Sequence, residues 1–277
     1  MSTKVVLITG TSSGIGLAAA VSASHAGFTT VATLRDPARA DALRKAAEAA
    51  GVELDIRRLD VTDAASVEEC VAGVIADHGR LDAVVNNAGA GHVGTIENES
   101  VDEVRRVMEV NFFGVVTVTR AALPHLRATG GRLLTVTSVG GVVGQPFNEA
   151  YCAAKFAAEG FMESLAPVAA SVGVAVGVIE PGAVASEFVA NVGVKEDAAA
   201  EAGVYGPALA NYISRTRGAF ANAQTSEEAA ATIIEALTAD RLPFRMQTSD
   251  VARAFAGGKL ADLDGSRIQT MTSAWVA

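Results

Sequence analysis

The sequence has few cysteines, few aromatic residues and an excess of negative charge. Two of its 277 residues are cysteines, Cys70 and Cys152, which is too few for a disulfide framework. Its 22 Lys and Arg residues against 31 Asp and Glu residues give a formal net charge of −9, so we expect no nucleic-acid partner. Its four histidines and two cysteines show no H-x-x-x-H or C-x-x-C spacing, so we expect no metal site.

Long apolar runs are also missing. No uninterrupted apolar stretch approaches the roughly 18 to 20 residues that cross a bilayer. The first strand-like segment follows Met-Ser-Thr-Lys directly, which leaves no room for a signal peptide. We therefore expect a cytoplasmic protein without a membrane span.

Strand-like and helix-like segments alternate along most of the chain. The predicted strands are Val5–Thr9, Thr29–Leu34, Leu54–Asp60, Ala83–Asn86, Arg132–Ser138, Ala175–Glu180 and Phe244–Gln247. The predicted helices are Leu17–Ala26, Pro37–Ala50, Ala64–His78, Val101–Ala128, Asn148–Ser171 and Glu227–Ala239. This alternation favours an α/β fold, a single Rossmann-like doubly wound parallel sheet of about seven strands with helices on both faces.

Residues 1–277 are expected to form one catalytic, dinucleotide-binding domain. Two segments interrupt the strand-helix rhythm. An insertion at about 187–225 falls at the carboxyl end of the predicted sheet, where insertions tend to form ligand walls or lids, although a surface excursion without function is the alternative. A C-terminal extension at about 250–277 has no assigned role.

A glycine-rich turn joins the first predicted strand to the first helix. Glycines let the backbone turn tightly and approach a pyrophosphate, and the helix N-terminus presents N–H groups and a positive dipole end to that anion. The spacing is G-x-x-x-G-x-G rather than the commoner G-x-G-x-x-G. A tight turn without a ligand is the alternative, but the position at the start of an α/β pattern favours nucleotide binding. The candidate cofactor contacts in this turn are Gly10, Ser12, Ser13, Gly14, Ile15 and Gly16.

The end of the second predicted strand bears on the choice of cofactor. An acidic residue there would bond the adenosine ribose 2′-hydroxyl, whereas a basic residue suits a 2′-phosphate. Arg35 occupies this place, and its guanidinium fork matches phosphate geometry. We expect the neighbouring Asp36 to cap the helix that begins at Pro37. NADP(H) is therefore favoured, and NAD(H) is possible.

Three residues in the middle of the chain suit proton transfer at a carbonyl oxygen. Tyr151 and Lys155 are four apart, so a helix places them on one face. The ammonium charge favours the phenolate and should lower the pKa of Tyr151, which makes this residue a general acid/base. Ser138, at the end of the fifth predicted strand, could hold the same carbonyl oxygen.

Asn111 falls inside an apolar helical face, where an asparagine is unfavourable. It therefore either has a polar partner or a water that bends the helix, or it faces solvent.

Together these motifs resemble the short-chain dehydrogenase/reductase family of the compact type, from roughly Lys4 to Gln247. The turn Thr9–Gly16 looks like the family's T-G-x-x-x-G-I-G, and Asn86–Gly89 reproduces its N-N-A-G. Asn111, Ser138, Tyr151 and Lys155 fall at positions similar to its catalytic tetrad. A closer likeness links Ala32–Asp36 and Tyr151–Ala153 to the 17β-hydroxysteroid and retinol dehydrogenase branch. Members of this branch that carry the Leu-Arg pair, here Leu34 and Arg35, generally prefer NADP(H).

The resemblance implies an NADP(H)-dependent oxidoreductase that transfers a hydride between nicotinamide and a ketone or secondary alcohol. Tyr151 is then the acid/base, Lys155 also holds the nicotinamide ribose, and Asn111 holds a water. Ser138 orients the carbonyl, so Ser138 and Tyr151 are the expected substrate contacts. Further expected cofactor contacts are Asp60 and Val61 at the adenine, Asn87, Ala88 and Gly89 after the fourth strand, and Pro181, Gly182, Val184 and Ser186 near the carboxamide, with Ser186 standing where threonine is usual.

The resemblance also implies a small, apolar carbonyl or alcohol substrate and a homodimer or homotetramer. Two alternatives stay open. An NAD-dependent alcohol dehydrogenase of the same fold would place Asp36, not Arg35, at the ribose. A non-catalytic dinucleotide-sensing protein would have no need of Ser138, Tyr151 and Lys155 together.

Overall fold

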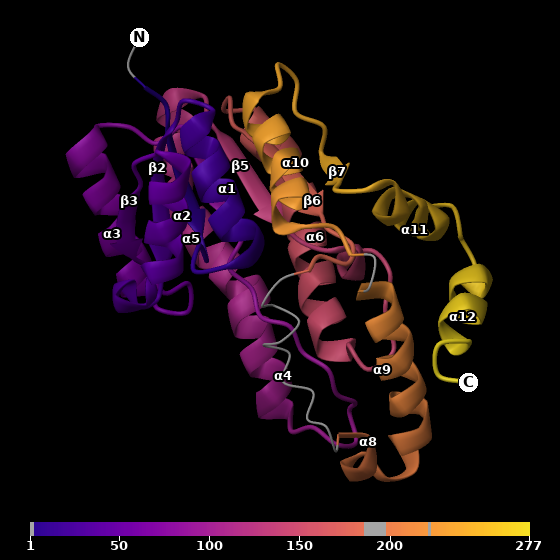
Figure 1. Ribbon diagram of the computed structural model, residues 1–277. Helices are drawn as coiled ribbons and strands as arrows, with labels where there is room; N and C mark the ends of the chain where they lie inside the picture. Colours follow the sequence, from indigo (N-terminus) through magenta and orange to yellow (C-terminus); the bar gives the residue numbers. More distant parts are fainter. Residues whose placement is uncertain (1–2, 186–197, 221–222) are drawn as a thin grey trace.

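The computed structural model describes residues 3–185, 198–220 and 223–277, and it is built around one sheet (Figure 1). Within these residues seven parallel strands follow the order β3-β2-β1-β4-β5-β6-β7. Their bounds are β1 Val5–Thr9, β2 Thr29–Leu34, β3 Asp55–Arg58, β4 Ala83–Asn86, β5 Arg132–Val136, β6 Ala175–Glu180 and β7 Arg245–Gln247. The strand order reverses beside β1, so the predicted doubly wound parallel sheet is confirmed.

Helices cover both faces of the sheet. One face carries α3 (Ala64–His78), α5 (Gly114–Thr129) and α6 (Glu149–Ala170), and the other carries α1 (Gly14–His25), α2 (Asp41–Ala50) and α10 (Ser226–Thr238). Side chains of β1 alternate between the two: Val5 and Leu7 pack against the first group, and Val6 and Ile8 against the second. Strands buried on both faces read as continuous apolar runs, which is the pattern of β1 and β4.

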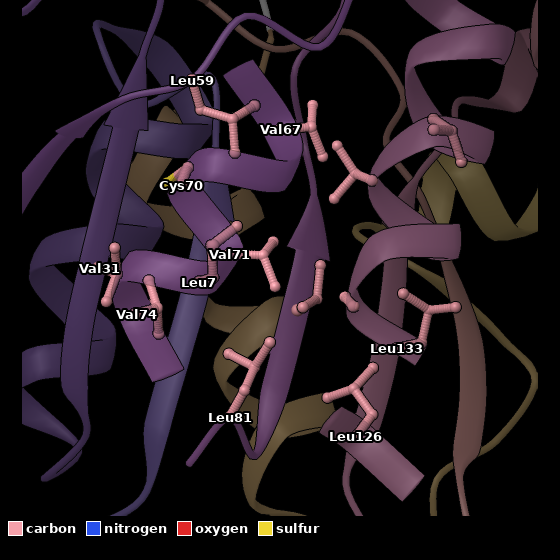
Figure 2. Packing of buried hydrophobic residues seen from close by; sticks show 14 of the residues in the cluster. Leu7, Val31, Leu59, Val67, Cys70, Val71, Val74, Leu81, Leu126 and Leu133 are labelled. Atoms are coloured by element: carbon pink, nitrogen blue, oxygen red, sulfur yellow. The ribbon is translucent and has the colours of Figure 1, made fainter. Parts of the chain in front are cut away.

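Figure 2 shows the core on the α3 and α5 side. Leu7 of β1 and Leu133 of β5 extend from the sheet toward Val71 of α3 and Leu126 of α5. Each of these side chains is at most 2% exposed, so the helices are fixed firmly on the sheet. This packing holds the strand ends, and whatever side chains they carry, in fixed relative positions.

Several predicted boundaries were wrong. β3 ends at Arg58 and β5 at Val136, each two residues earlier than expected, and α1 begins at Gly14 rather than Leu17. Pro37 opens a short 3₁₀ turn, Pro37–Arg39, and α2 follows at Asp41. The predicted helix Val101–Ala128 consists of α4 (Val101–Met108), a π-helical turn (Glu109–Phe113) and α5.

The insertion and the C-terminal extension are helical where the structure describes them. The insertion contains α8 (Ala198–Glu201), a 3₁₀ turn (Gly203–Tyr205) and α9 (Gly206–Phe220), and the extension contains α11 (Asp250–Leu260) and α12 (Ser266–Ser273). In Figure 1, α9 and α12 lie at the same end of the molecule as α4 and the C-terminus. Over the described ranges, no helix is both long enough and apolar enough to cross a membrane.

Candidate active site

The glycine turn after β1 is held in a conformation that needs its glycines. Gly10 and Gly14 have φ angles of 70° and 57°, in the left-handed region. A Cβ on Gly16 would lie 2.3 Å from Asn87 Nδ2 and 2.3 Å from the Gly10 carbonyl oxygen, so a larger residue does not fit there. The turn that follows β1 therefore packs closely against Asn87, which follows β4.

The start of α1 suits an anion. Ser13 is the N-cap residue, but its side chain makes no capping hydrogen bond, and no acidic side chain lies in the first helical turn. The backbone N–H groups of this turn form the positive end of the helix dipole, and no acidic side chain of the first turn neutralises it. Ser12 is exposed at the turn, and Ser13, Gly14 and Ile15 are half-buried. These residues fit a dinucleotide pyrophosphate.

Asn87 and Thr9 brace the turn from behind. Asn87 Nδ2 donates to the carbonyl oxygens of Thr9 (2.9 Å) and Gly10 (3.0 Å). The Thr9 hydroxyl accepts from the backbone N–H groups of Asn87 and Ala88, both at 3.0 Å. The amide donors of Asn87 are thus used within the protein, which gives this residue a supporting role. Sequence reasoning placed Thr9 in the turn motif but gave it no role, although a hydroxyl residue that ends an apolar strand was a signal for one.

At the end of β2, Arg35 and Asp36 differ in their surroundings. Asp36 accepts a hydrogen bond from the Ala38 backbone at 3.0 Å and caps the turn at Pro37, as predicted. Arg35 is exposed, and its charge acts on Asp60 beyond β3. Burial raises the pKa of Asp60, but hydrogen bonds from Thr62 and the Arg35 charge outweigh it and hold that pKa below its usual value. The neighbouring Val61 is 7% exposed and packs on Gly114 of α5.

Ser138, Tyr151 and Lys155 meet just beyond the end of β5. The Ser138 hydroxyl accepts from the Gly140 backbone at 2.9 Å and is hydrogen-bonded to Tyr151. Lys155 lies 5.8 Å from the centroid of the Tyr151 ring, and its Nζ donates to the Val136 carbonyl oxygen at 3.1 Å. The structure therefore brings together the three residues that the sequence selected for proton transfer.

The pKa of Tyr151 shifts in the direction opposite to the one predicted. Burial raises this pKa, and the hydrogen bond with Ser138 opposes the rise without cancelling it. The Lys155 ammonium, 5.8 Å from the centroid of the ring, does not overcome this rise in the pKa of Tyr151. Burial also lowers the pKa of Lys155 to about 8, while the charge of Glu159 raises it. Lys155 is 4% exposed, and it keeps its proton at neutral pH.

Asn111 lies in the π-helical turn between α4 and α5 and is fully buried. Its Nδ2 donates to the carbonyl oxygens of Ala90 and Val107, both at 3.0 Å, and its Oδ1 accepts from the Ala90 backbone at 3.2 Å. A Cβ on Gly89 would lie 2.9 Å from Asn111 Oδ1 and 3.4 Å from Lys155 Nζ, so the three residues adjoin. The expected polar partner and helix distortion are confirmed, and the solvent-facing alternative is wrong.

The turn after β6 approaches the same region. The Pro181 carbonyl oxygen accepts from the Val139 backbone at 2.9 Å, next to Ser138. Gly182 is half-buried, and Val184 is 7% exposed and pairs with Gln224. Ser186 lies outside the described residues.

The insertion contributes to a buried apolar cluster beside the N-terminus of α6. The rings of Phe147 and Tyr212 of α9 lie 5.7 Å apart, and Leu209 and Val93 belong to the same cluster. Asn148, three residues before Tyr151, donates from Nδ2 to the Tyr212 hydroxyl at 2.6 Å. Sequence reasoning did not select these residues individually, since they become neighbours through tertiary packing.

The chain is similar in sequence to known dehydrogenases. A family model described as short chain dehydrogenase matches residues 4–197. The chain is 36% identical to retinol dehydrogenase 8 of Bos taurus over 273 residues, covering 95% of this chain and 87% of that protein. It is 38% identical to 17-beta-hydroxysteroid dehydrogenase type 1 of Homo sapiens over 280 residues, covering 98% of this chain and 85% of that protein.

Solved structures agree with the sequence relatives. A short-chain dehydrogenase from Streptomyces avermitilis superposes with a TM-score of 0.80 at 31% identity, covering 99% of this chain and 98% of the other. An alcohol dehydrogenase from the archaeon Thermococcus sibiricus, solved in complex with 5-hydroxy-NADP, superposes with a TM-score of 0.72 at 27% identity, covering 89% and 96%. Among the residues described for this chain, no three His, Cys, Asp or Glu side chains are grouped to hold a metal ion.

Proposed function

Because the chain belongs to the short-chain dehydrogenase/reductase family of oxidoreductases, in the branch of the 17β-hydroxysteroid and retinol dehydrogenases, we propose that it transfers a hydride between NADP(H) and a ketone or secondary alcohol. The observation that carries this proposal is the hydrogen-bonded pair Ser138–Tyr151 with the buried Lys155 ammonium beneath the phenol. Nicotinamide, when bound, supplies or accepts the hydride. The residues of the chain manage the proton and the developing negative charge.

Tyr151 is the proposed acid/base. In reduction its hydroxyl gives a proton to the forming alkoxide oxygen, and in oxidation its phenolate takes that proton. The Ser138 hydroxyl already accepts from the Gly140 backbone, so its single hydrogen is available to donate. It donates toward Tyr151 or toward the substrate oxygen, and so stabilises negative charge on either.

Lys155 and Asn111 support this proton transfer. The Lys155 ammonium favours the phenolate form of Tyr151 and is proposed to hold the nicotinamide ribose hydroxyls. Asn111 Oδ1 and Lys155 Nζ both approach Gly89, which supports a water held between them as a proton path to solvent.

We further propose that the protein prefers NADP(H). The exposed Arg35 guanidinium at the end of β2 suits a 2′-phosphate. The carboxylate of Asp36 is engaged as a cap, which argues against its use as an adenosine ribose ligand in the NAD-dependent alternative. Asp60 and Val61 are proposed to frame the adenine, and Pro181, Gly182, Val184 and Ser186 to lie near the carboxamide.

The substrate is proposed to be apolar. Phe147, Leu209 and Tyr212 form an apolar cluster beside the helix end that carries Tyr151. Two relatives bear the names of retinol and 17-beta-hydroxysteroid dehydrogenases, which supports a ketone or secondary alcohol on an apolar body. We infer that residues 1–277 act as one catalytic domain.

We also propose that the chain forms a homodimer or homotetramer. Phe113, the last residue of the π-helical turn before α5, is 48% exposed, and Phe156 on α6 is 40% exposed. Apolar side chains at such exposure suit a second copy of the chain. Size-exclusion chromatography with light scattering gives the mass directly.

The test is the variant Tyr151→Phe assayed with NADPH on a panel of apolar ketones, following absorbance of the reduced nicotinamide. We expect turnover to be lost and NADPH binding to be nearly unchanged. A rate above a few per cent of the wild type would reject Tyr151 as the acid. Wild-type protein that binds NADPH but reduces nothing would favour the dinucleotide-sensing alternative, and a preference for NADH would favour the NAD-dependent one.

A further inference from the structure

A buried group of charges lies directly behind the candidate active site. Glu159, one helical turn beyond Lys155 on α6, is 3% exposed. Its Oε1 accepts from the Thr137 hydroxyl at 2.5 Å, and its Oε2 accepts from Arg245 Nε of β7 at 3.3 Å. Glu180 of β6 is fully buried, with its Oε1 3.1 Å from the same Arg245 nitrogen. Nothing in the proposed chemistry yet uses these groups.

The end of β5 is fastened to α6 through three consecutive residues. Val136 accepts from Lys155, Thr137 donates to Glu159, and Ser138 is hydrogen-bonded to Tyr151. The three partners on the helix, Tyr151, Lys155 and Glu159, are spaced by four residues, so the bonds reach successive turns of one face. The Thr137 backbone N–H also donates to the Ile179 carbonyl oxygen of β6 at 2.8 Å, so loss of the middle bond would loosen the segment on its α6 side, where Ser138 meets Tyr151.

The charges around Glu159 come from three elements. Lys155 and Glu163 lie one turn away on either side along α6, Glu180 belongs to β6, and Arg245 belongs to β7. Lys155, Glu159, Glu180 and Arg245 carry two positive and two negative charges when all are ionised. Glu163 lies 3.1 Å from Arg245 Nη2, but its side chain is 60% exposed.

Glu159 is the charged neighbour that supports the Lys155 ammonium. Burial lowers the pKa of Lys155, and the charge of Glu159 raises it. The groups nearest to Lys155 on the active-site side, Tyr151 and Asn111, are a phenol and an amide without formal charge. Burial, together with the charge of Glu180, raises the pKa of Glu159 itself to about 7, against the bonds from Thr137 and Arg245. The Glu159 carboxylate therefore prevails above neutral pH.

We propose that Glu159 is a positioning residue for the proton transfer: its carboxylate keeps Lys155 in the ammonium form and ties the segment that carries Ser138 to the helix that carries Tyr151. This role rests on the proposed function for its catalytic meaning, but its electrostatic part is a property of the protein alone. Thr137 and Arg245 hold the carboxylate in place. Glu163, which contacts the same Arg245 from the solvent side, has no such role.

The first experiment follows the ionisation of Lys155 in the full-length protein without substrate or nucleotide. Protein labelled with [13Cε]lysine is titrated by NMR, and Lys155→Met identifies the resonance. In Glu159→Gln the midpoint should fall by about 0.5 to 1 pH unit, since a nearby negative charge is removed. In Glu163→Gln, the matched control one turn away, the midpoint should stay at the wild-type value. Equal midpoints in the wild type and Glu159→Gln, or equal shifts in both variants, would overturn the proposal.

A second variant guards against failure of Glu159→Gln to fold. Thr137→Val keeps the Glu159 side chain and removes its hydroxyl donor, which makes the carboxylate harder to form. The Lys155 midpoint should then fall in the same direction, and Thr137→Ser should restore it. A wild-type midpoint in folded Thr137→Val, together with a Glu159→Gln protein that does not fold, would reduce Glu159 to a structural role and overturn the proposal.

The second experiment links this charge to turnover. Removing a buried negative charge lowers the pKa of Lys155, and the proposed proton transfer needs the Lys155 ammonium, so ketone reduction in Glu159→Gln should decline at lower pH than in the wild type. The wild-type and variant profiles should approach each other below about pH 7, where Glu159 is protonated. We expect kcat to fall several-fold with little change in KM for NADPH. A wild-type protein without turnover would refute the proposed function, whereas the lysine titration would still decide the electrostatic role of Glu159.

Discussion

Replacement of Lys155 by methionine tests the electrostatics of the site, because the cost of a buried ammonium depends on pH. Burial lowers the pKa of Lys155 from 10.5 to about 8. Between these values the folded protein has released a proton that the unfolded chain still holds. The stability of the wild type should therefore rise as the pH rises from about 8 to 10.5. The same stability is lost as the pH falls back toward 8.

The two pKa values set the size of the effect. They give Lys155 a contribution to the free energy of unfolding that rises by about 2 kcal/mol between pH 8 and pH 10. Methionine carries no titratable group, so the variant lacks this rise. The variant also leaves the Val136 carbonyl oxygen without its donor, which costs about 1 to 3 kcal/mol at every pH. The slope against pH thus separates the charge from the lost hydrogen bond.

Urea unfolding of the wild type and Lys155→Met, followed by circular dichroism at several values between pH 8 and pH 10, measures this slope. Groups that titrate alike in both proteins cancel in the difference. The free energy of unfolding of the wild type minus that of the variant should grow by about 2 kcal/mol over the range. Two curves that stay parallel to within about 0.5 kcal/mol would mean that Lys155 titrates normally in the folded protein, and would refute the reasoning.

Two further pairs of substitutions test the cofactor site. Arg35→Ala should raise KM for NADPH by about tenfold or more and leave KM for NADH unchanged. Asp36→Ala removes a cap and should cost about 1 kcal/mol of stability without changing the preference for NADPH. If steady-state kinetics instead show that Asp36→Ala alters the cofactor preference and Arg35→Ala does not, the NAD-dependent alternative is supported. Gly16→Ala should cost about 1 to 3 kcal/mol and weaken NADPH binding at least about tenfold, because its Cβ would lie 2.3 Å from two atoms. Gly160→Ala on α6 meets nothing within 4 Å and should be neutral or stabilising in the same melts and titrations, so equal effects would contradict the assignment.

The features that sequence predicted well are those set by local spacing. The apolar runs of β1 and β4, the glycine turn and the cap at Asp36 depend on residues within a few positions of one another. Tyr151 and Lys155 share one face because a helix repeats every 3.6 residues. Such features need no knowledge of which distant segments meet, and so a single chain carries enough information to place them.

Features that arise from distant contacts were missed or misjudged. The sequence predicted a polar partner for Asn111 but could not identify it as the backbone of Ala90, 21 residues away. The direction of the pKa shift of Tyr151 depends on how deeply the fold buries it, which no spacing reveals. The contact between Glu159 and Arg245 spans 86 residues. Predicted β5 ran on to Ser138 because Thr137 and Ser138 continue a strand-like pattern, although the chain leaves the sheet there to reach α6.

The placement of buried polar groups argues for catalysis over nucleotide sensing. Burying the Lys155 ammonium and the Glu180 carboxylate costs free energy, and well-packed apolar side chains are often more stable in such positions. A sensor would need the glycine turn and Arg35, which lie away from these groups. The buried charges lie instead near the ends of β5 and β6: Lys155 contacts β5, and Arg245 links Glu180 to the helix that carries Tyr151. Folding alone gives no reason to concentrate charge at this point, whereas moving a proton to and from a phenol does.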